Sequence, residues 1–240
     1  MNAYETRLEG REEVAEGTTA FHFGKPRDFS FKPGQAVDVV LPAAAGTDPQ
    51  GIRHAFSLVS GPFEDHLTIA TRMRDSAFKG ALKALAIGST VTLDGPFGAL
   101  TLHNNRARPA VLIAGGIGIT PFMSILRQAA RDHLPQRLVL LYSNRRPEDA
   151  AFLAELQELE QRLENFRLVA TMTRMDQSTR TWAGETGVID PALVNRVANG
   201  LPQPICYLAG PPRMVEAMHK LLNLAGVDDD DIRSEDFYGY

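Results

Sequence analysis

The stretch AVLIAGGIGITPFMSIL, residues 110–126, joins an unbroken apolar run, a glycine-rich turn and the start of a helix. An apolar run without alternation is typical of a parallel strand that is covered on both faces. A turn of this kind presents bare backbone N–H groups at the carboxyl edge of a sheet, where open α/β sheets bind phosphate-bearing ligands. The stretch therefore predicts a nucleotide phosphate site, with a tight turn that only packs helix on strand as the alternative.

The turn departs from the usual dinucleotide fingerprint, because Pro121 stands where a third glycine is expected. We expect Thr120 to cap the helix and Pro121 to occupy its first position, where a missing N–H costs nothing. The proline would then fix the start of the helix and leave the anion site intact.

Strands and helices alternate through the second half of the chain. Strands are expected at 137–143, 166–173 and 205–210, and helices over 147–163 and 211–226. In the first of these helices Phe152, Leu156, Leu159 and Leu163 form one apolar stripe. This alternation predicts a doubly wound parallel sheet.

The first half of the chain has a different pattern. Short strand candidates, separated by Gly and Pro, cover residues 6–15, 17–23, 34–42, 66–73 and 89–98, and one helix is expected from about Ser76 to Leu85. We therefore expect two domains, an antiparallel β-barrel over residues 1–104 and an α/β domain over residues 105–240.

Composition sets limits on function and location. The 240 residues carry a net charge of −4, one cysteine and six scattered histidines without metal-ligand spacing. We expect no nucleic acid partner, no membrane insertion and no metal. The N-terminus lacks a signal-peptide pattern, so a cytoplasmic location is the expectation. We also expect a monomer.

Residues after the second predicted strand of the α/β domain bear on the choice of coenzyme. The acidic residue that would hold a ribose hydroxyl about 20 positions after the turn is missing. Ser143, Arg145 and Arg146 are present instead. Hydroxyl and guanidinium groups suit a 2′-phosphate, which favours NADPH over NADH, although the arginines could equally be solvated charges before a helix.

Two stretches of the first half also carry candidate ligand contacts. Residues 52–60 place an aromatic side chain beside a hydroxyl at a strand end, after two basic residues. Residues 72–82 begin a helix with Ser76 as cap and basic residues around it, which favours a second phosphate group. Taken singly, Phe56 could be core and Ser76 only a cap.

In their order along nearly the whole chain, these motifs resemble the ferredoxin–NADP reductase superfamily of flavoproteins. The flavin motif Arg-x-Tyr/Phe-Ser/Thr resembles residues 54–57, the flavin pyrophosphate motif 74–79, and the pyridine-nucleotide motif Gly-Gly-x-Gly-x-Thr-Pro matches 115–121. Cys-Gly-Pro-Pro resembles 209–212. The C-terminal aromatic that stacks on the flavin has counterparts in Phe237, Tyr238 and Tyr240.

The chain departs from the family pattern at two places. His54 replaces the phosphate-binding arginine, so Arg53 together with Arg72 or Arg74 is expected to supply the charge. Ala209 replaces a cysteine near the nicotinamide, which implies slower hydride transfer. Cys206, three residues upstream, is expected to be buried and inert.

The resemblance implies an FAD-dependent NAD(P)H oxidoreductase, with FMN as the alternative flavin. It would take hydride from NADPH or NADH and pass single electrons to ferredoxin, flavodoxin or an oxygenase component. A non-autonomous subunit of a larger complex and a redox-sensing nucleotide-binding module are the alternatives.

The resemblance also implies site residues. The expected catalytic residues are Phe56, Ser57 and Tyr240. Apart from the resemblance, Glu235 or Asp236 of the acidic tail is a candidate for moving a proton, with a merely solvated tail as the alternative. The expected cofactor-binding residues are Arg53, His54, Ala55, Phe56, Ser57, Thr71, Arg72, Met73, Ser76, Ala77, Phe78, Gly115, Gly116, Gly118, Thr120, Pro121, Ser143, Arg145, Arg146, Gly210, Pro211 and Phe237.

Overall fold

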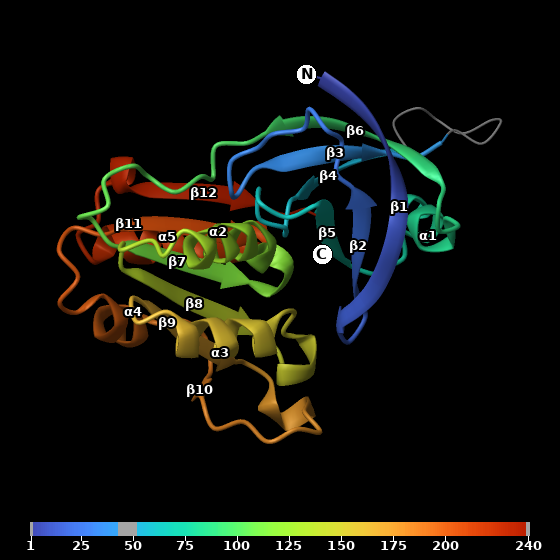
Figure 1. Cartoon of the computed structure of the whole chain (residues 1–240). Helices are drawn as coiled ribbons and strands as arrows, with labels where there is room; N and C mark the ends of the chain where they lie inside the picture. The colour runs from blue at the N-terminus through green and yellow to red at the C-terminus, as the bar shows by residue number, and fades with distance from the viewer. Residues whose placement is uncertain (1, 43–51, 239–240) are drawn as a thin grey trace.

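The computed structural model describes residues 2–42 and 52–238 and contains two six-stranded sheets side by side (Figure 1). The first sheet has the order β4-β3-β6-β1-β2-β5, and every neighbouring pair is antiparallel. A bridge between Leu58 and Ile69 joins its two end strands, so the sheet closes into the predicted barrel. Its elements are β1 (Asn2–Ala15), β2 (Thr18–Gly24), β3 (Ala36–Val40), β4 (Arg53–Ser57), β5 (His66–Arg72), α1 (Ala77–Ala84) and β6 (Thr90–Phe97).

The barrel follows the period-two pattern of its strands. In β3, Val37 and Val39 are fully buried while Asp38 between them is partly exposed. The predicted helix is present as α1, which places Phe78 and Leu82 on the same core. Its start is fixed as expected, because the hydroxyl of Ser76 accepts a hydrogen bond from the backbone N–H of Lys79.

The second sheet has the order β10-β9-β8-β7-β11-β12, and all of its pairs are parallel. The predicted doubly wound sheet is therefore confirmed. Its elements are β7 (Ala110–Gly115), α2 (Ile119–Arg131), β8 (Leu138–Asn144), α3 (Leu153–Arg162), β9 (Phe166–Met172), β10 (Glu185–Thr186), α4 (Pro191–Ala198), β11 (Ile205–Gly210), α5 (Pro212–Leu224) and β12 (Ile232–Asp236).

Helices cover both faces of this sheet (Figure 1). Alternate residues of β7 enter two separate cores, which explains its unbroken apolar sequence. Leu112 packs with α2 and α3 on one face, and Val111 and Ile113 pack with α4 and α5 on the other.

Four elements differ from the sequence prediction or were missing from it. The helix expected over 147–163 begins only at Leu153, after a 3₁₀ turn at 147–149 and a left-handed residue, Phe152, with φ 60°. Helix α4 and the edge strands β10 and β12 were not predicted. Strand β12 matters most for the site, since it pairs with β11 and leads into Phe237.

The two domains share one apolar core. Ala20, Val59 and Ala70 of the barrel pack in the same cluster as Phe122 and Ile125 of α2. The expected boundary at 104/105 falls in the connection between β6 and β7 and stays a prediction. None of the helices in the described ranges is long and apolar enough to span a membrane, and no three His, Cys, Asp or Glu side chains there are grouped to hold a metal ion.

Candidate functional site

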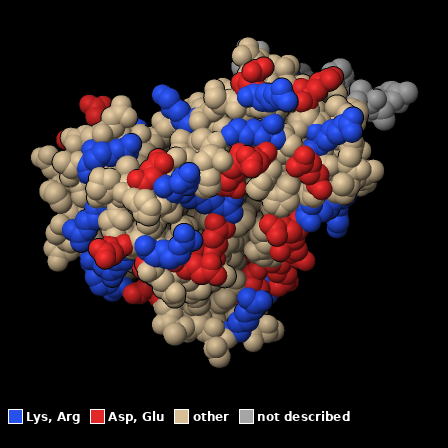
Figure 2. Space-filling model, viewed as in Figure 1, with Lys and Arg blue, Asp and Glu red and all other residues tan. Residues whose placement is uncertain are grey.

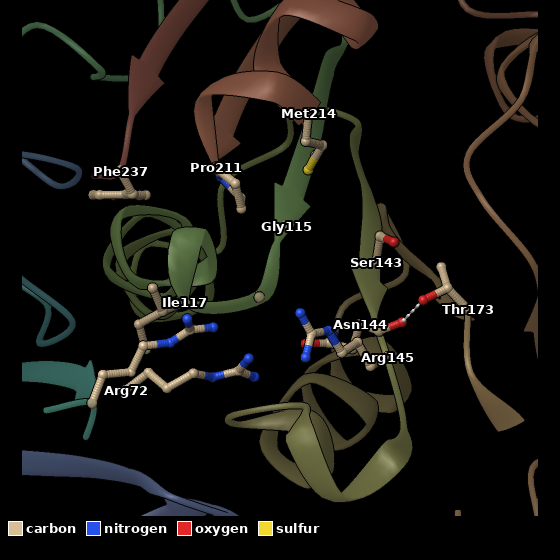
Figure 3. A pocket seen from close by; sticks show the side chains of 12 residues that line it. Arg72, Gly115, Ile117, Ser143, Asn144, Arg145, Thr173, Pro211, Met214 and Phe237 are labelled. Carbon is tan, nitrogen blue, oxygen red and sulfur yellow. Dashed lines mark hydrogen bonds between the residues drawn. The ribbon is translucent and has the colours of Figure 1, made fainter. Parts of the chain in front are cut away.

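The order of the parallel sheet reverses direction between β7 and β11, and such switch points are where open α/β sheets bind ligands. A pocket of about 220 Å³ lies at the carboxyl ends of these strands, facing the end of β5 from the barrel (Figure 3). The residues that line it are Arg72, Arg74, Gly115, Gly116, Ile117, Ser143, Asn144, Arg145, Thr173, Pro211, Met214 and Phe237.

The glycine turn brings two chain segments too close for side chains. A Cβ atom on Gly118 would collide with the backbone carbonyl of Ala209, and one on Gly115 would collide with Met214. Gly116 differs, because it has φ +54° and open space beyond its Cα. Two of these glycines therefore fit the turn against β11 and α5, and the third leaves its outer side open to the pocket.

The start of α2 is not the one expected from the sequence. The helix begins at Ile119 after a 3₁₀ turn at 116–118, and no side chain caps it. Thr120 lies inside the first turn, where its hydroxyl donates to the carbonyl of Ile117 at 3.0 Å, so the capping prediction was wrong. Pro121 is still within the first turn, where no backbone N–H is required.

Three guanidinium groups converge on the pocket from both domains. Arg72 is the last residue of β5, Arg74 lies two residues further along the chain, and Arg145 follows β8. Figure 3 shows the side chains of Arg72 and Arg145 pointing toward each other across the opening. No carboxylate lines the pocket, and no ion pair engages these three side chains within the described residues. The pKa of Asp149 is lowered mainly by its hydrogen bond to Arg146 and also by the nearby charges of Arg72 and Arg145. Like charges that are held together without an ion pair of their own favour an anionic ligand.

Arg146, which was expected to bind the coenzyme beside Arg145, is engaged elsewhere. Its guanidinium donates to both carboxylate oxygens of Asp149 at 3.0 Å and pairs with Glu16 of the barrel at 3.2 Å. These hydrogen bonds raise the pKa of Arg146 above its ordinary value. The structure thus separates two adjacent arginines, one facing the pocket and one joining the domains.

Asn144 is a pocket residue that the sequence reasoning missed. It is 5% exposed, and both polar atoms of its side-chain amide are buried without a hydrogen-bond partner of ordinary geometry. Buried polar atoms are nearly always satisfied, so this amide, which also interacts with the hydroxyl of Tyr142, is a candidate contact for a ligand. Thr173 was also missed; it follows β9, and polar residues at the carboxyl ends of parallel strands are the signal that would have identified both.

On the barrel side, Ser57 at the end of β4 and Glu235 of β12 form a second polar feature. The hydroxyl of Ser57 is buried and has no hydrogen-bond partner of ordinary geometry. Burial raises the pKa of Glu235, and interaction with Ser57 opposes that rise. Two residues further on, the N–H of Phe237 donates to Gly210 and its ring reaches the pocket.

The aromatic part of the predicted flavin motif is present, but Arg53, one of the cations expected beside it, is engaged elsewhere. His54 stacks on Phe56 with ring centroids 4.8 Å apart, and Phe78 of α1 lies 5.8 Å from Phe56. Arg53 forms ion pairs with Asp38 and Asp94, which raise the pKa of its guanidinium. The expectation that Arg53 supplies the phosphate charge is therefore not supported.

The remaining expected residues lie in several environments. Thr71 is buried on β5, and Met73 is partly buried against the barrel core. Ala55 and Ala77 are exposed on β4 and α1. Tyr240 lies outside the described residues.

Cys206 is buried as expected, and burial raises the pKa of its thiol to about 12. Gly210 and Pro211 form the turn into α5, with Pro211 lining the pocket.

Glu148 holds together the loops on the β8 and β9 side of the pocket. Its carboxylate accepts hydrogen bonds from the hydroxyl of Ser178 and from the backbone N–H and hydroxyl of Thr179 at 2.8–3.0 Å. Burial alone would raise the pKa of Glu148, but its hydrogen bonds outweigh burial and lower the pKa to about 2.

This carboxylate is expected to support stability at neutral pH and to lose that role in acid. Because the folded-state pKa lies below the unfolded value, the stabilising contribution is complete above about pH 4.5 and declines as the pH falls toward 2. In Glu148→Gln we expect a lower melting temperature at pH 7 and a shallower decline below pH 4.5, followed by thermal melts across that range. Glu158→Gln, an exposed position on α3, is the control, and equal pH profiles for E148Q and wild type would contradict the assignment.

Comparison with known proteins shows which proteins this chain resembles. Residues 112–220 match the model of the oxidoreductase NAD-binding domain. The chain is 30% identical to a ferredoxin–NADP reductase of Sorangium cellulosum, covering 84% of this chain and 83% of the relative. It is 27% identical to the glycine betaine monooxygenase reductase subunit of Chromohalobacter salexigens, over 92% of this chain and 60% of that protein. The first curated relatives are longer, and the chain spans 57–61% of their length.

Solved structures agree with the fold. A ferredoxin–NADP reductase from Neisseria gonorrhoeae with bound FAD and NADP has a TM-score of 0.80 at 23% identity, covering 98% of each chain. A cytochrome P450 reductase of Amycolatopsis has a TM-score of 0.82 at 26% identity, covering 98% of this chain and 70% of that one. An antiparallel barrel joined to a doubly wound nucleotide-binding sheet defines the two-domain reductases. Within this class, the chain belongs to the ferredoxin–NADP reductase superfamily.

Proposed function

We propose that this chain is an FAD-dependent NAD(P)H oxidoreductase that delivers electrons to a separate redox protein. The observation that carries the proposal is the pocket at the switch point, where arginines of both domains face a phosphate-binding turn. Beside it, β12 carries the half-buried Glu235 and leads into Phe237. The pocket supplies an anion site, and Glu235 supplies a carboxyl group on the strand that leads into the pocket residue Phe237.

The barrel residues fit a flavin in their chemistry. Ser57 offers a buried hydroxyl beside Glu235, and the ring stack of His54, Phe56 and Phe78 offers apolar contact. Arg74 and the N–H groups at the start of α1 suit its phosphates. A bound flavin would supply the ability to accept a hydride and to release electrons one at a time.

The chain's own side chains would position the reactants and manage the proton. The hydroxyl of Ser57 can donate a hydrogen bond to a ring nitrogen. Glu235, whose pKa is raised by burial, can hold a proton at a higher pH than an exposed carboxylate. Phe237, with its N–H fixed by Gly210, closes one wall of the pocket and helps to exclude water.

For the coenzyme, we propose NADPH. Arg145 and the hydroxyl of Ser143 would hold the 2′-phosphate, while Arg72 would approach the pyrophosphate near Gly116. The buried amide of Asn144 would complete the polar contacts.

For the electron acceptor, we propose an oxygenase component or a ferredoxin. Relatives of this chain include reductase components of propane 2-monooxygenases and electron transfer components of 2-halobenzoate and toluate dioxygenases. A cytoplasmic location and a monomeric state remain expectations from the sequence.

The test is spectroscopic and kinetic. Protein incubated with FAD and desalted should keep an absorbance band at about 450 nm, and anaerobic NADPH should bleach it within one turnover. Steady NADPH oxidation with ferricyanide would exclude a subunit without independent turnover, and bleaching would exclude a sensor that binds without transfer. A protein that retains no flavin would overturn the proposal.

A further inference from the structure

A second cavity, of about 520 Å³, lies between the domains away from the coenzyme pocket, and the two share no lining residue. Its size falls within the range of small-molecule sites. It is lined by Phe31, Lys32, Pro33, Pro62, Thr101, Leu102, His103, Asn104, Arg106, Ile125, Gln128, Ala129, Asp132, Leu134 and Arg233.

The cavity lies at the opposite edge of the parallel sheet from the coenzyme pocket. Residues 101–106 precede β7, Leu134 precedes β8, and Arg233 is near the start of β12. The coenzyme pocket, in contrast, is formed by residues at the carboxyl ends of β7 and β8. The green connection in Figure 1, which runs from β6 past β12 to β7, contributes one wall.

Positive charge predominates in this cavity. Lys32, Arg106 and Arg233 line it, against the single carboxylate of Asp132. Asp132 already accepts a hydrogen bond from the amide of Gln128 at 2.8 Å. Figure 2 shows positive and negative side chains interspersed over the face seen in Figure 1.

The two arginines are held in place by neutral groups. Arg106 donates to the side-chain oxygen of Gln136 at 3.0 Å, and Arg233 donates to the carbonyl of Thr101 at 2.9 Å. The guanidinium of Arg233 also lies over the ring of Tyr207, 5.4 Å from its centre. Neither arginine forms an ion pair within the described residues. Their positions are thus fixed while their charges remain available to a ligand.

The rest of the lining is partly apolar and partly polar, the polar part coming from Thr101, His103, Asn104 and Gln128. Phe31 and two proline rings come from the barrel, and Ile125 and Leu134 come from the α/β domain. The side-chain oxygen of Gln128 is buried without a hydrogen-bond partner. A ligand that fits has an anionic group for the cations and a flat apolar body for these walls.

We propose that this cavity binds a small aromatic carboxylate as a second ligand, independent of flavin and coenzyme. The carboxylate would lie among Lys32, Arg106 and Arg233, and the ring would lie against Phe31. Since Lys32 belongs to the barrel and both arginines to the other side of the junction, a bound carboxylate would join the domains. It should therefore raise the melting temperature.

Benzoate is the probe, and benzamide is its neutral counterpart of nearly the same shape. Calorimetric titration of the purified protein should show benzoate binding with a Kd below about 10 mM and no detectable binding of benzamide. Benzoate binding should persist in saturating NADP⁺ and in the Arg145→Gln variant, because NADP⁺ and Arg145 belong to the coenzyme pocket.

Variants locate the binding site. Lys32→Gln, at an exposed position, should weaken benzoate binding by about two- to fivefold. Arg233→Gln, which loses a charged hydrogen bond, should weaken it by about tenfold or more. Lys83→Gln, an exposed lysine of α1, should leave the affinity unchanged. Equal binding of benzoate and benzamide, displacement by NADP⁺, or unchanged affinity in K32Q would each overturn the proposal.

Discussion

Replacing Arg145 with glutamine is expected to lower kcat/KM for NADPH by about 10- to 100-fold and kcat/KM for NADH by less than about threefold. Arg145 lines the pocket, and no carboxylate pairs with it within the described residues, so its charge is available to a phosphate group. A hydrogen bond to a charged partner is worth several times a neutral one, and NADH lacks the 2′-phosphate that would receive it. Initial rates with ferricyanide at fixed ionic strength measure both ratios.

The adjacent arginine provides a matched control. Arg146→Gln removes the same charge one residue further along the chain, but that guanidinium is held by Asp149 and Glu16. We expect kinetics with both coenzymes to change by less than about twofold and the melting temperature to fall slightly. Equal losses in R145Q for NADPH and NADH would show that Arg145 binds a phosphate common to both.

The different environments of these arginines also show what a sequence can reveal about a site. The order of strands, the glycine turn and the basic residues after β8 were all evident from local patterns. Which arginine faces the pocket was not. Arg146 is held mainly by Asp149, three residues away, and also by Glu16, 130 residues away, and the sequence does not show that these carboxylates engage Arg146 rather than Arg145. Arg53 is a second example, because it forms ion pairs with Asp38 and Asp94, which lie on two other strands.

The missed elements have a similar cause. Strand β12 reads IRSED, a polar segment that pairs on one side only with β11, so it lacks the apolar run of a central strand. Helix α4 did carry a local signal, because Asp190 caps it and Pro191 occupies its first turn. The helix is short and lies among loops, so its apolar periodicity extends over too few residues to be recognised.

The second large effect is expected from substitutions at two glycines of the turn. One substitution should weaken coenzyme binding, and the other should lower stability. In Gly116→Asn the backbone can keep its left-handed conformation, which asparagine tolerates, and the space around the new side chain is open. That space is where the phosphate is proposed to bind. We expect the melting temperature to change by less than about 3 °C and the KM for NADPH to rise by at least about tenfold.

Gly118→Ala, in contrast, should act mainly by lowering the stability of the protein. The new Cβ meets the backbone of Ala209 and Gly210, which cannot rotate away as a side chain could, so α2 or β11 must move. Overpacking of this kind costs about 1–3 kcal/mol, a fall of several degrees in the melting temperature. Gly80→Ala, within α1 and with open space around it, should instead raise stability slightly. If G116N keeps full affinity for NADPH, the open side of the turn is not the phosphate site, whatever the stability of G118A.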